Sequence, residues 1–138
     1  MSKLIFSIDV EDWFHSVHIS PYKSKITSSH SSIPIMKDLL DFLDLRGIKG
    51  TFFCLGVIAK KHPELISEIS KKGHEIASHG WDHTIISKMS RQELEEDIRK
   101  STEILSEHSD QEIIGYRSPC FSQNKYLDDV LIKYGYKY

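Results

Sequence analysis

Apolar and polar residues alternate in blocks along the chain, and most blocks have the length of one strand or one helix. Short, nearly continuous apolar runs predict buried strands over 3–8, 51–55, 74–78 and 112–116. Between these runs, apolar residues recur every three or four positions, as on one face of an amphipathic helix. This spacing predicts helices from Pro34 to Gly47, from Pro63 to Gly73, from Ser90 onward and over 124–134.

Local signals mark several of the predicted boundaries. Ser90 with Glu93 three residues later forms a capping box, a common start of a helix. Residues 14–33 are rich in Ser, His and Lys and predict a long loop, and loops of that length are often functional. Residues 136–138 resemble the start of a fifth strand.

A strand followed by a helix, repeated four times, indicates an α/β fold of parallel strands joined by right-handed crossovers. An open doubly wound sheet and a (β/α) barrel both fit this order. The first strand is followed by no glycine-rich phosphate loop, which weakens the nucleotide-binding version. Because the chain stops as a fifth strand begins, we expect it to be the N-terminal part of a longer barrel. Four unclosed strands would leave open edges, so self-association is also expected.

Composition narrows the class of protein. The 138 residues are 39% hydrophobic and 28% charged, which is typical of one globular domain, and the formal net charge is −2. That charge gives no reason to expect binding to nucleic acid or to an anionic membrane. No run of apolar residues is long enough for a membrane span or a signal peptide. With only Cys54 and Cys120 as cysteines, the prediction is a cytoplasmic protein without a disulfide framework.

Chemically active side chains gather where the predicted strands end. The carboxyl ends of parallel strands lie on one face of an α/β fold, so residues that follow different strands can form one site. The residues in such positions are Asp9, Glu11 and Asp12 after the first strand, His79 and His83 after the third, and Arg117 and Pro119 after the fourth.

The two histidines are candidate metal ligands. His79 and His83 are four residues apart, a spacing that places both imidazoles on one side of a helical turn. Two histidines and one carboxylate leave coordination positions open, as in zinc hydrolases and in non-haem iron oxygenases. Of the carboxylates at 9–12, one can bind the ion while another serves as a general base.

Four segments carry a family resemblance. The runs SIDVEDWFH, TFFCLG, HEIASHGWDH and GYRSPCF, taken in order, resemble the polysaccharide deacetylase family, or NodB-homology family. The resemblance implies that 1–138 is a deacetylase-like domain holding the N-terminal part of a distorted (β/α)7 barrel. It also implies hydrolysis of N-acetyl groups on an amino sugar in a polysaccharide or glycan precursor, with one divalent metal ion, zinc being the expected one.

The resemblance also implies roles for individual residues. Asp9 would be the base and Arg117 would hold it. Glu11, His79 and His83 would bind the metal. The substrate would be bound by Pro119, Cys120, whose neighbourhood offers a backbone N–H to the oxyanion, and Trp81.

This chain departs from the family pattern at three positions. Val10 separates Asp9 from Glu11, whereas the family's acids are adjacent, so Asp12 is a rival ligand. Gly80 stands where the family often has Ser or Thr, and Cys120 stands where an aromatic is common. The family's later motifs, including a histidine that acts as general acid, would lie beyond residue 138. A non-catalytic metal- or glycan-binding fragment and an amide hydrolase acting on a non-sugar substrate are therefore alternative functions.

Overall fold

A parallel three-stranded sheet forms the centre of the molecule. The computed structural model describes residues 5–16 and 31–138. In these ranges the strands β1 (Ser7–Val10), β2 (Thr51–Cys54) and β3 (Glu75–Ser78) lie side by side in that order. The predicted α/β class is confirmed. The first strand was predicted over 3–8 but runs to Val10, so Asp9 is inside the strand; residues 3 and 4 lie outside the described ranges.

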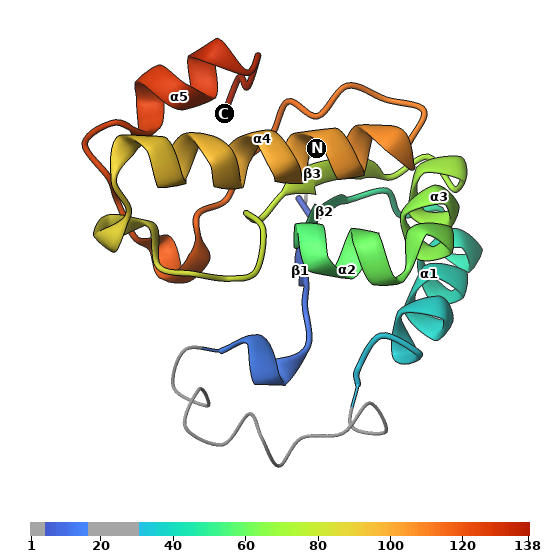
Figure 1. The fold of residues 1–138 in the computed structure, drawn as a ribbon. Helices are drawn as coiled ribbons and strands as arrows, with labels where there is room; N and C mark the ends of the chain where they lie inside the picture. The colour runs from blue at the N-terminus through green and yellow to red at the C-terminus, as the bar shows by residue number, and fades with distance from the viewer. Residues whose placement is uncertain (1–4, 17–30) are drawn as a thin grey trace.

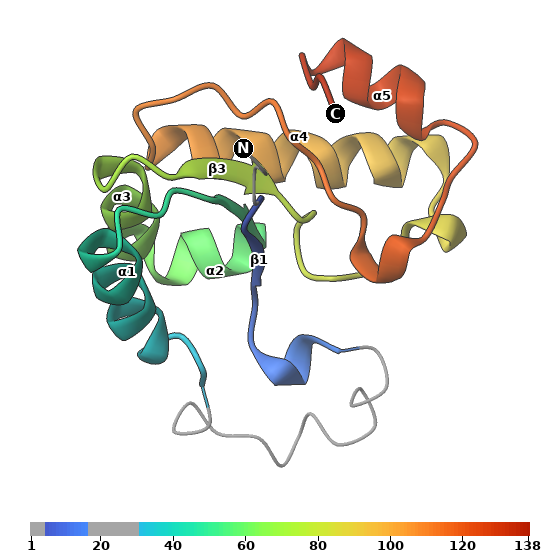
Figure 2. The same ribbon diagram turned by 180° about the vertical axis from the view of Figure 1, so that it is seen from behind.

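Helices surround this sheet. They are α1 (Ile35–Leu45), α2 (Gly56–Lys61), α3 (Pro63–Lys71), α4 (Arg91–Glu107) and α5 (Leu127–Lys133), with short 3-10 turns at Trp13–His15, Ile86–Lys88 and Pro119–Phe121. The long helix α4 runs beside β3, and α5 lies on the side of α4 away from α2 (Figures 1 and 2). The helices α1 and α3 stand together at one end of the sheet (Figure 1). No helix of the described ranges is long and apolar enough to cross a membrane.

Several helix ends follow directly from the sequence. The predicted capping box at α4 is present: Ser90 Oγ accepts the N–H of Glu93, and the Glu93 carboxylate accepts the N–H of Ser90. Pro63 begins α3 at a position where a missing N–H costs nothing. Gly47 follows α1 with a φ of 64°, a left-handed conformation that favours glycine.

Helix α2 was missed by the sequence analysis. It begins at Gly56, directly after β2, and the preceding Leu55 makes no side-chain cap hydrogen bond. The run from Thr51 to Ala59 is apolar almost throughout, so periodicity gives no sign of the change from strand to helix. This short helix matters because its first turn contacts the candidate site.

The core lies between the sheet and the helices. The helices α1, α3 and α4 each bury residues at helical spacing. The strands β2 and β3 are buried on both faces, whereas the edge strand β1 is fully buried only at Val10. Complete burial of an aliphatic side chain stabilises a fold by roughly 1.5–3 kcal/mol. The fully buried side chains include Leu40, Phe52, Ile66, Ile69, Ile76, Leu94, Ile98 and Leu105.

The predicted fourth strand, over 112–116, is wrong as a regular strand. Only Tyr116 forms a bridge, parallel to Ser78 at the end of β3. Further back, the edge of β3 is occupied by the side chain of Gln111, which accepts the N–H of Ile76 and donates to the carbonyl of His74. A side chain thus takes the hydrogen bonds that a fourth strand would otherwise make.

The remaining predicted elements are partly realised. Lys137 and Tyr138 make backbone hydrogen bonds to Ile114 and Tyr116 without forming a regular strand. The last helix begins at Leu127 and not at residue 124, because the Asn124 side chain bonds the carbonyls of Ile86 and Met89 and holds a turn. Of the predicted loop at 14–33, residues 17–30 lie outside the described ranges.

Candidate metal centre

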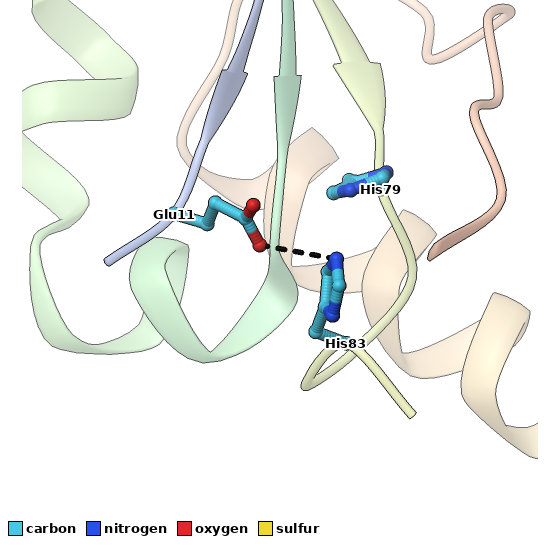
Figure 3. Close-up of side chains that lie close together, drawn as sticks. All are labelled: Glu11, His79 and His83. Atoms are coloured by element: carbon cyan, nitrogen blue, oxygen red, sulfur yellow. Dashed lines mark ion pairs between the residues drawn. The ribbon is translucent and has the colours of Figure 1, made fainter. Parts of the chain in front are cut away.

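The three strand ends bring the predicted site residues to one place. Asp9 lies in β1 and Glu11 just beyond it, His79 follows β3 directly, and Arg117 follows the bridge residue Tyr116. Figure 3 shows the carboxyl ends of the strands pointing toward the space between Glu11, His79 and His83. This is the arrangement expected for a site built on parallel strands.

Glu11, His79 and His83 form a compact triplet. One possible ligand atom from each lies within 4.8 Å of the other two. His83 Nε2 is 3.2 Å from Glu11 Oε2, and the two imidazole centroids are 5.1 Å apart (Figure 3). Both histidines are buried, whereas the Glu11 side chain is 28% exposed, so the triplet is open to solvent on the carboxylate side.

The hydrogen bond of His79 fixes its tautomer. Its Nδ1 lies 2.6 Å from the backbone oxygen of Arg117, which can only accept. Nδ1 therefore carries the proton, and the Nε2 lone pair is left to bind a cation, as is usual for metal-binding histidines. In the described part of the chain, Glu11 Oε2 is buried without a hydrogen bond of good geometry, despite its closeness to His83. A buried carboxylate oxygen without a donor fits a cation ligand.

The electrostatics of the triplet favour neutral imidazoles. Burial lowers the pKa of His79, and burial and the neighbouring His79 lower the pKa of His83. Burial, with a contribution from Asp9, raises the pKa of Glu11 to about 6. Neutral imidazole is the form that binds a metal, and a bound cation would offset the desolvation of the Glu11 carboxylate. Two imidazoles and a carboxylate are a donor set suited to zinc and related divalent ions.

Asp9 stands beside the triplet and is held by Arg117. The guanidinium donates to Asp9 Oδ1 at 2.5 Å and to Ser7 Oγ at 2.9 Å. It also stacks on the ring of Phe53, with 3.9 Å from Cζ to the centroid. The other Asp9 oxygen is 3.9 Å from His79 Nε2. A carboxylate oriented in this way can accept a proton next to the candidate metal position.

Asp12, the rival ligand, is used elsewhere. Its side chain is buried and accepts hydrogen bonds from Ser31 Oγ at 2.8 Å and from the N–H and hydroxyl of Ser32 at 2.6 and 2.9 Å. These bonds fasten the segment after β1 to the start of α1. The sequence left Glu11 and Asp12 open, and it is Glu11 that lies with the histidines.

The predicted substrate-binding residues lie in different settings. Pro119 is buried, while Cys120 is exposed with a φ of 53°, in the left-handed region. The ring of Trp81 covers Gly56 so closely that a Cβ added there would be 2.4 Å from it. Contact of these three residues with a sugar stays a prediction.

One buried carboxylate near the site escaped the sequence analysis. Asp97 on α4 is 9% exposed, and both of its oxygens face the N–H of Trp81 at 3.2 Å. The sequence does contain a sign that Asp97 is buried. It is next to Ile98 and three residues after Leu94, on the face of α4 that the apolar residues predict to be buried.

Fold and site together define an α/β protein with a two-histidine, one-carboxylate cluster at the carboxyl ends of parallel strands. The polysaccharide deacetylase profile matches residues 31–138, and the chain belongs to that family. The predicted resemblance is thereby confirmed. The matched segment contains His79, His83 and Arg117 but begins after Asp9 and Glu11, so the place of these acids in the site rests on the geometry above.

Individual relatives agree with this assignment. Over 70 residues the chain is 36% identical to the peptidoglycan-N-acetylglucosamine deacetylase PgdA of Listeria monocytogenes, covering 51% of this chain and 15% of that protein. Over 61 residues it is 34% identical to a chitooligosaccharide deacetylase of Sinorhizobium fredii, covering 44% of this chain and 28% of that one. The chain thus spans less than a third of these relatives.

A solved structure extends the similarity to the fold. A Mycobacterium smegmatis protein assigned to the polysaccharide deacetylases superposes with a TM-score of 0.82 at 28% identity, covering 96% of this chain and 48% of that one. The predicted fold, the N-terminal part of a NodB-like barrel, is therefore confirmed.

Proposed function

We propose that this chain carries the metal-binding and proton-accepting part of a hydrolase that removes N-acetyl groups from an amino sugar. The observation that supports this most is the triplet of Glu11, His79 and His83 within 4.8 Å, with Asp9 and its Arg117 partner directly beside it. A carboxylate base next to an open cation site suits hydrolysis of an unactivated amide.

The metal would be held by Glu11 and the two histidines. When bound, a divalent ion would supply Lewis acidity, which polarises a carbonyl and makes water more acidic. The residues of the chain hold and orient this ion. His79 is presented in the correct tautomer by the Arg117 carbonyl, and Glu11 supplies the negative charge. Zinc is the ion we propose, because imidazole and carboxylate together are a frequent catalytic zinc set.

Asp9 would accept the proton of the attacking water. Its carboxylate is fixed by Arg117, so one oxygen is engaged and the other remains directed at the site, 3.9 Å from His79 Nε2. The hydrogen bond from the guanidinium holds the Asp9 carboxylate in one orientation beside the triplet.

The substrate class is inferred from the relatives. The two relatives named above are a peptidoglycan-N-acetylglucosamine deacetylase and a chitooligosaccharide deacetylase. The exposed segment at Cys120 and Phe121, which follows the buried Pro119, lies at the end of the same loop as Arg117 and is available for contact with such a sugar.

Acetate release tests this function. The protein, supplied with zinc, is incubated with N-acetylglucosamine oligomers, and free acetate and free amine are measured together with those from the Asp9→Asn variant. We expect equal amounts of acetate and amine from the wild type and a loss of at least about 100-fold in the variant, the usual range for a general base. Zinc binding without any acetate release would argue instead for the non-catalytic alternative, a metal- or glycan-binding role.

A further inference from the structure

The two candidate histidine ligands sit at either end of a loop without regular structure. Residues 80–82 join His79 to His83, and His83 itself has a φ of 69°. Such a loop has no helical or sheet hydrogen bonds to set its shape. The distance between the imidazoles therefore depends on what holds the loop from outside.

One side of this loop is held by the start of α2. The N–H of Gly56 donates to the carbonyl of Gly80, and the N–H of Val57 donates to the carbonyl of Trp81, both at 2.9 Å. The absence of a side chain at Gly56 also leaves room for the Trp81 ring, because a Cβ at residue 56 would collide with that ring. These contacts fix the carbonyls of Gly80 and Trp81 but do not involve the N–H of Trp81.

The opposite side is held by the carboxylate of Asp97. Both of its oxygens lie 3.2 Å from the N–H of Trp81, midway between the two ligands in sequence. Asp97 belongs to the long helix α4, whose first turn is capped and whose buried face packs against β3, so it provides a rigid support. A carboxylate buried to this degree is costly to keep, and a single backbone N–H repays only part of that cost.

Gly80 provides the room for this contact. Its φ is 78°, and a Cβ added there would lie 3.1 Å from Asp97 Oδ1. A serine or threonine at this position, which the family pattern often has, would press on the carboxylate. The position of the Asp97 carboxylate beside the loop therefore depends on a glycine at residue 80.

We propose that Asp97 is a positioning residue that sets the separation of His79 and His83, and thereby the affinity and coordination geometry of the metal site. This inference rests on the proposed metal-binding function. Asp97 touches neither ligand and would act through the peptide N–H of Trp81.

Cobalt binding tests the proposal, because Co²⁺ reports both affinity and geometry through its visible absorption. Asp97→Leu removes the acceptor oxygens at similar size, whereas Asp97→Asn keeps one acceptor oxygen. Thr102→Val is the matched control: it removes another hydrogen bond of α4, the part-buried hydroxyl pair of Thr102 and Tyr136 at 2.8 Å, and keeps the Asp97–Trp81 contact. Affinity and spectrum are measured well below the melting temperature of each variant.

We expect Asp97→Leu to bind Co²⁺ at least tenfold more weakly with a changed spectrum, and Asp97→Asn and Thr102→Val to stay within threefold of the wild type. Wild-type affinity and spectrum in Asp97→Leu would overturn the proposal, as would an equally large loss in Thr102→Val. Should Asp97→Leu not fold, Asp97→Glu replaces it, since the longer side chain must displace the loop; an unaltered spectrum there also overturns the proposal. A wild type that binds no Co²⁺ would refute the proposed metal site itself, and this outcome is distinguishable from a failure of the Asp97 proposal alone.

Discussion

His79 Nδ1 donates to the backbone oxygen of Arg117, and the side chain of that same arginine donates to Asp9. Arg117 therefore orients the candidate ligand His79 through its main chain and the candidate base Asp9 through its side chain. Because the two roles use different atoms of Arg117, substitution of the side chain can separate them.

Arg117→Met should leave metal binding nearly intact while lowering deacetylase activity. The carbonyl that orients His79 remains, so the zinc Kd should stay within about threefold, compared with the 10- to 100-fold cost of losing a partner of a ligand. Asp9 loses its donor, so kcat/KM should fall about 100-fold or more. Calorimetric zinc titration and acetate release measure the two effects. Ser7→Ala removes only the second guanidinium contact and serves as the control; parallel loss of zinc and activity in Arg117→Met would contradict the separation.

Glu11 and Asp12 are adjacent acids with opposite expected behaviour. Glu11→Gln removes a candidate ligand and should weaken zinc binding more than about 100-fold, beyond the cost of losing an outer partner. Asp12→Asn disturbs the hydrogen bonds to Ser31 and Ser32 and should cost about 1–3 kcal/mol of unfolding free energy, with little effect on zinc. Zinc titration and urea unfolding of both variants decide between the two acids. Loss of zinc in Asp12→Asn alone would make Asp12 the ligand.

The buried Asp97 should leave a signature in the pH dependence of stability. Burial raises its pKa from 3.8 to about 6 in the folded protein. The folded state therefore holds this proton more tightly than the unfolded state, and stability is lost as pH rises from about 4 to 6, by on the order of 3 kcal/mol. Asp97→Asn cannot titrate and should flatten this part of the curve. Urea unfolding at several pH values, without metal, measures the difference; identical slopes for wild type and variant would contradict it.

Much of the site could be predicted because it depends on strand order. Residues near the ends of parallel strands converge on one edge of the sheet, so the sequence alone predicted that Asp9, His79 and Arg117 would lie together, as they do. The choice between Glu11 and Asp12 could not be made, since it depends on Ser31 and Ser32, about twenty residues further along the chain.

The elements that were missed share a physical reason. The strand predicted at 112–116 has a suitable apolar pattern, but the Gln111 side chain occupies the edge of β3, and no local pattern reveals such a tertiary contact. Helix α2 has no capping side chain that would mark its start. Asp97 lies in a helix with several other acidic residues, so its type alone does not distinguish it. Each of these features depends on a partner that is distant in sequence.

Zinc stoichiometry is the most direct test of the proposed metal centre. Calorimetric titration of the metal-free protein should show one zinc ion per chain, and the double variant His79→Ala/His83→Ala should show none. His108→Ala, which removes a histidine at the end of α4 outside the triplet, should bind like the wild type. A wild type that binds no zinc, or a double variant that binds it with undiminished affinity, would contradict the assignment of Glu11, His79 and His83 as a metal site.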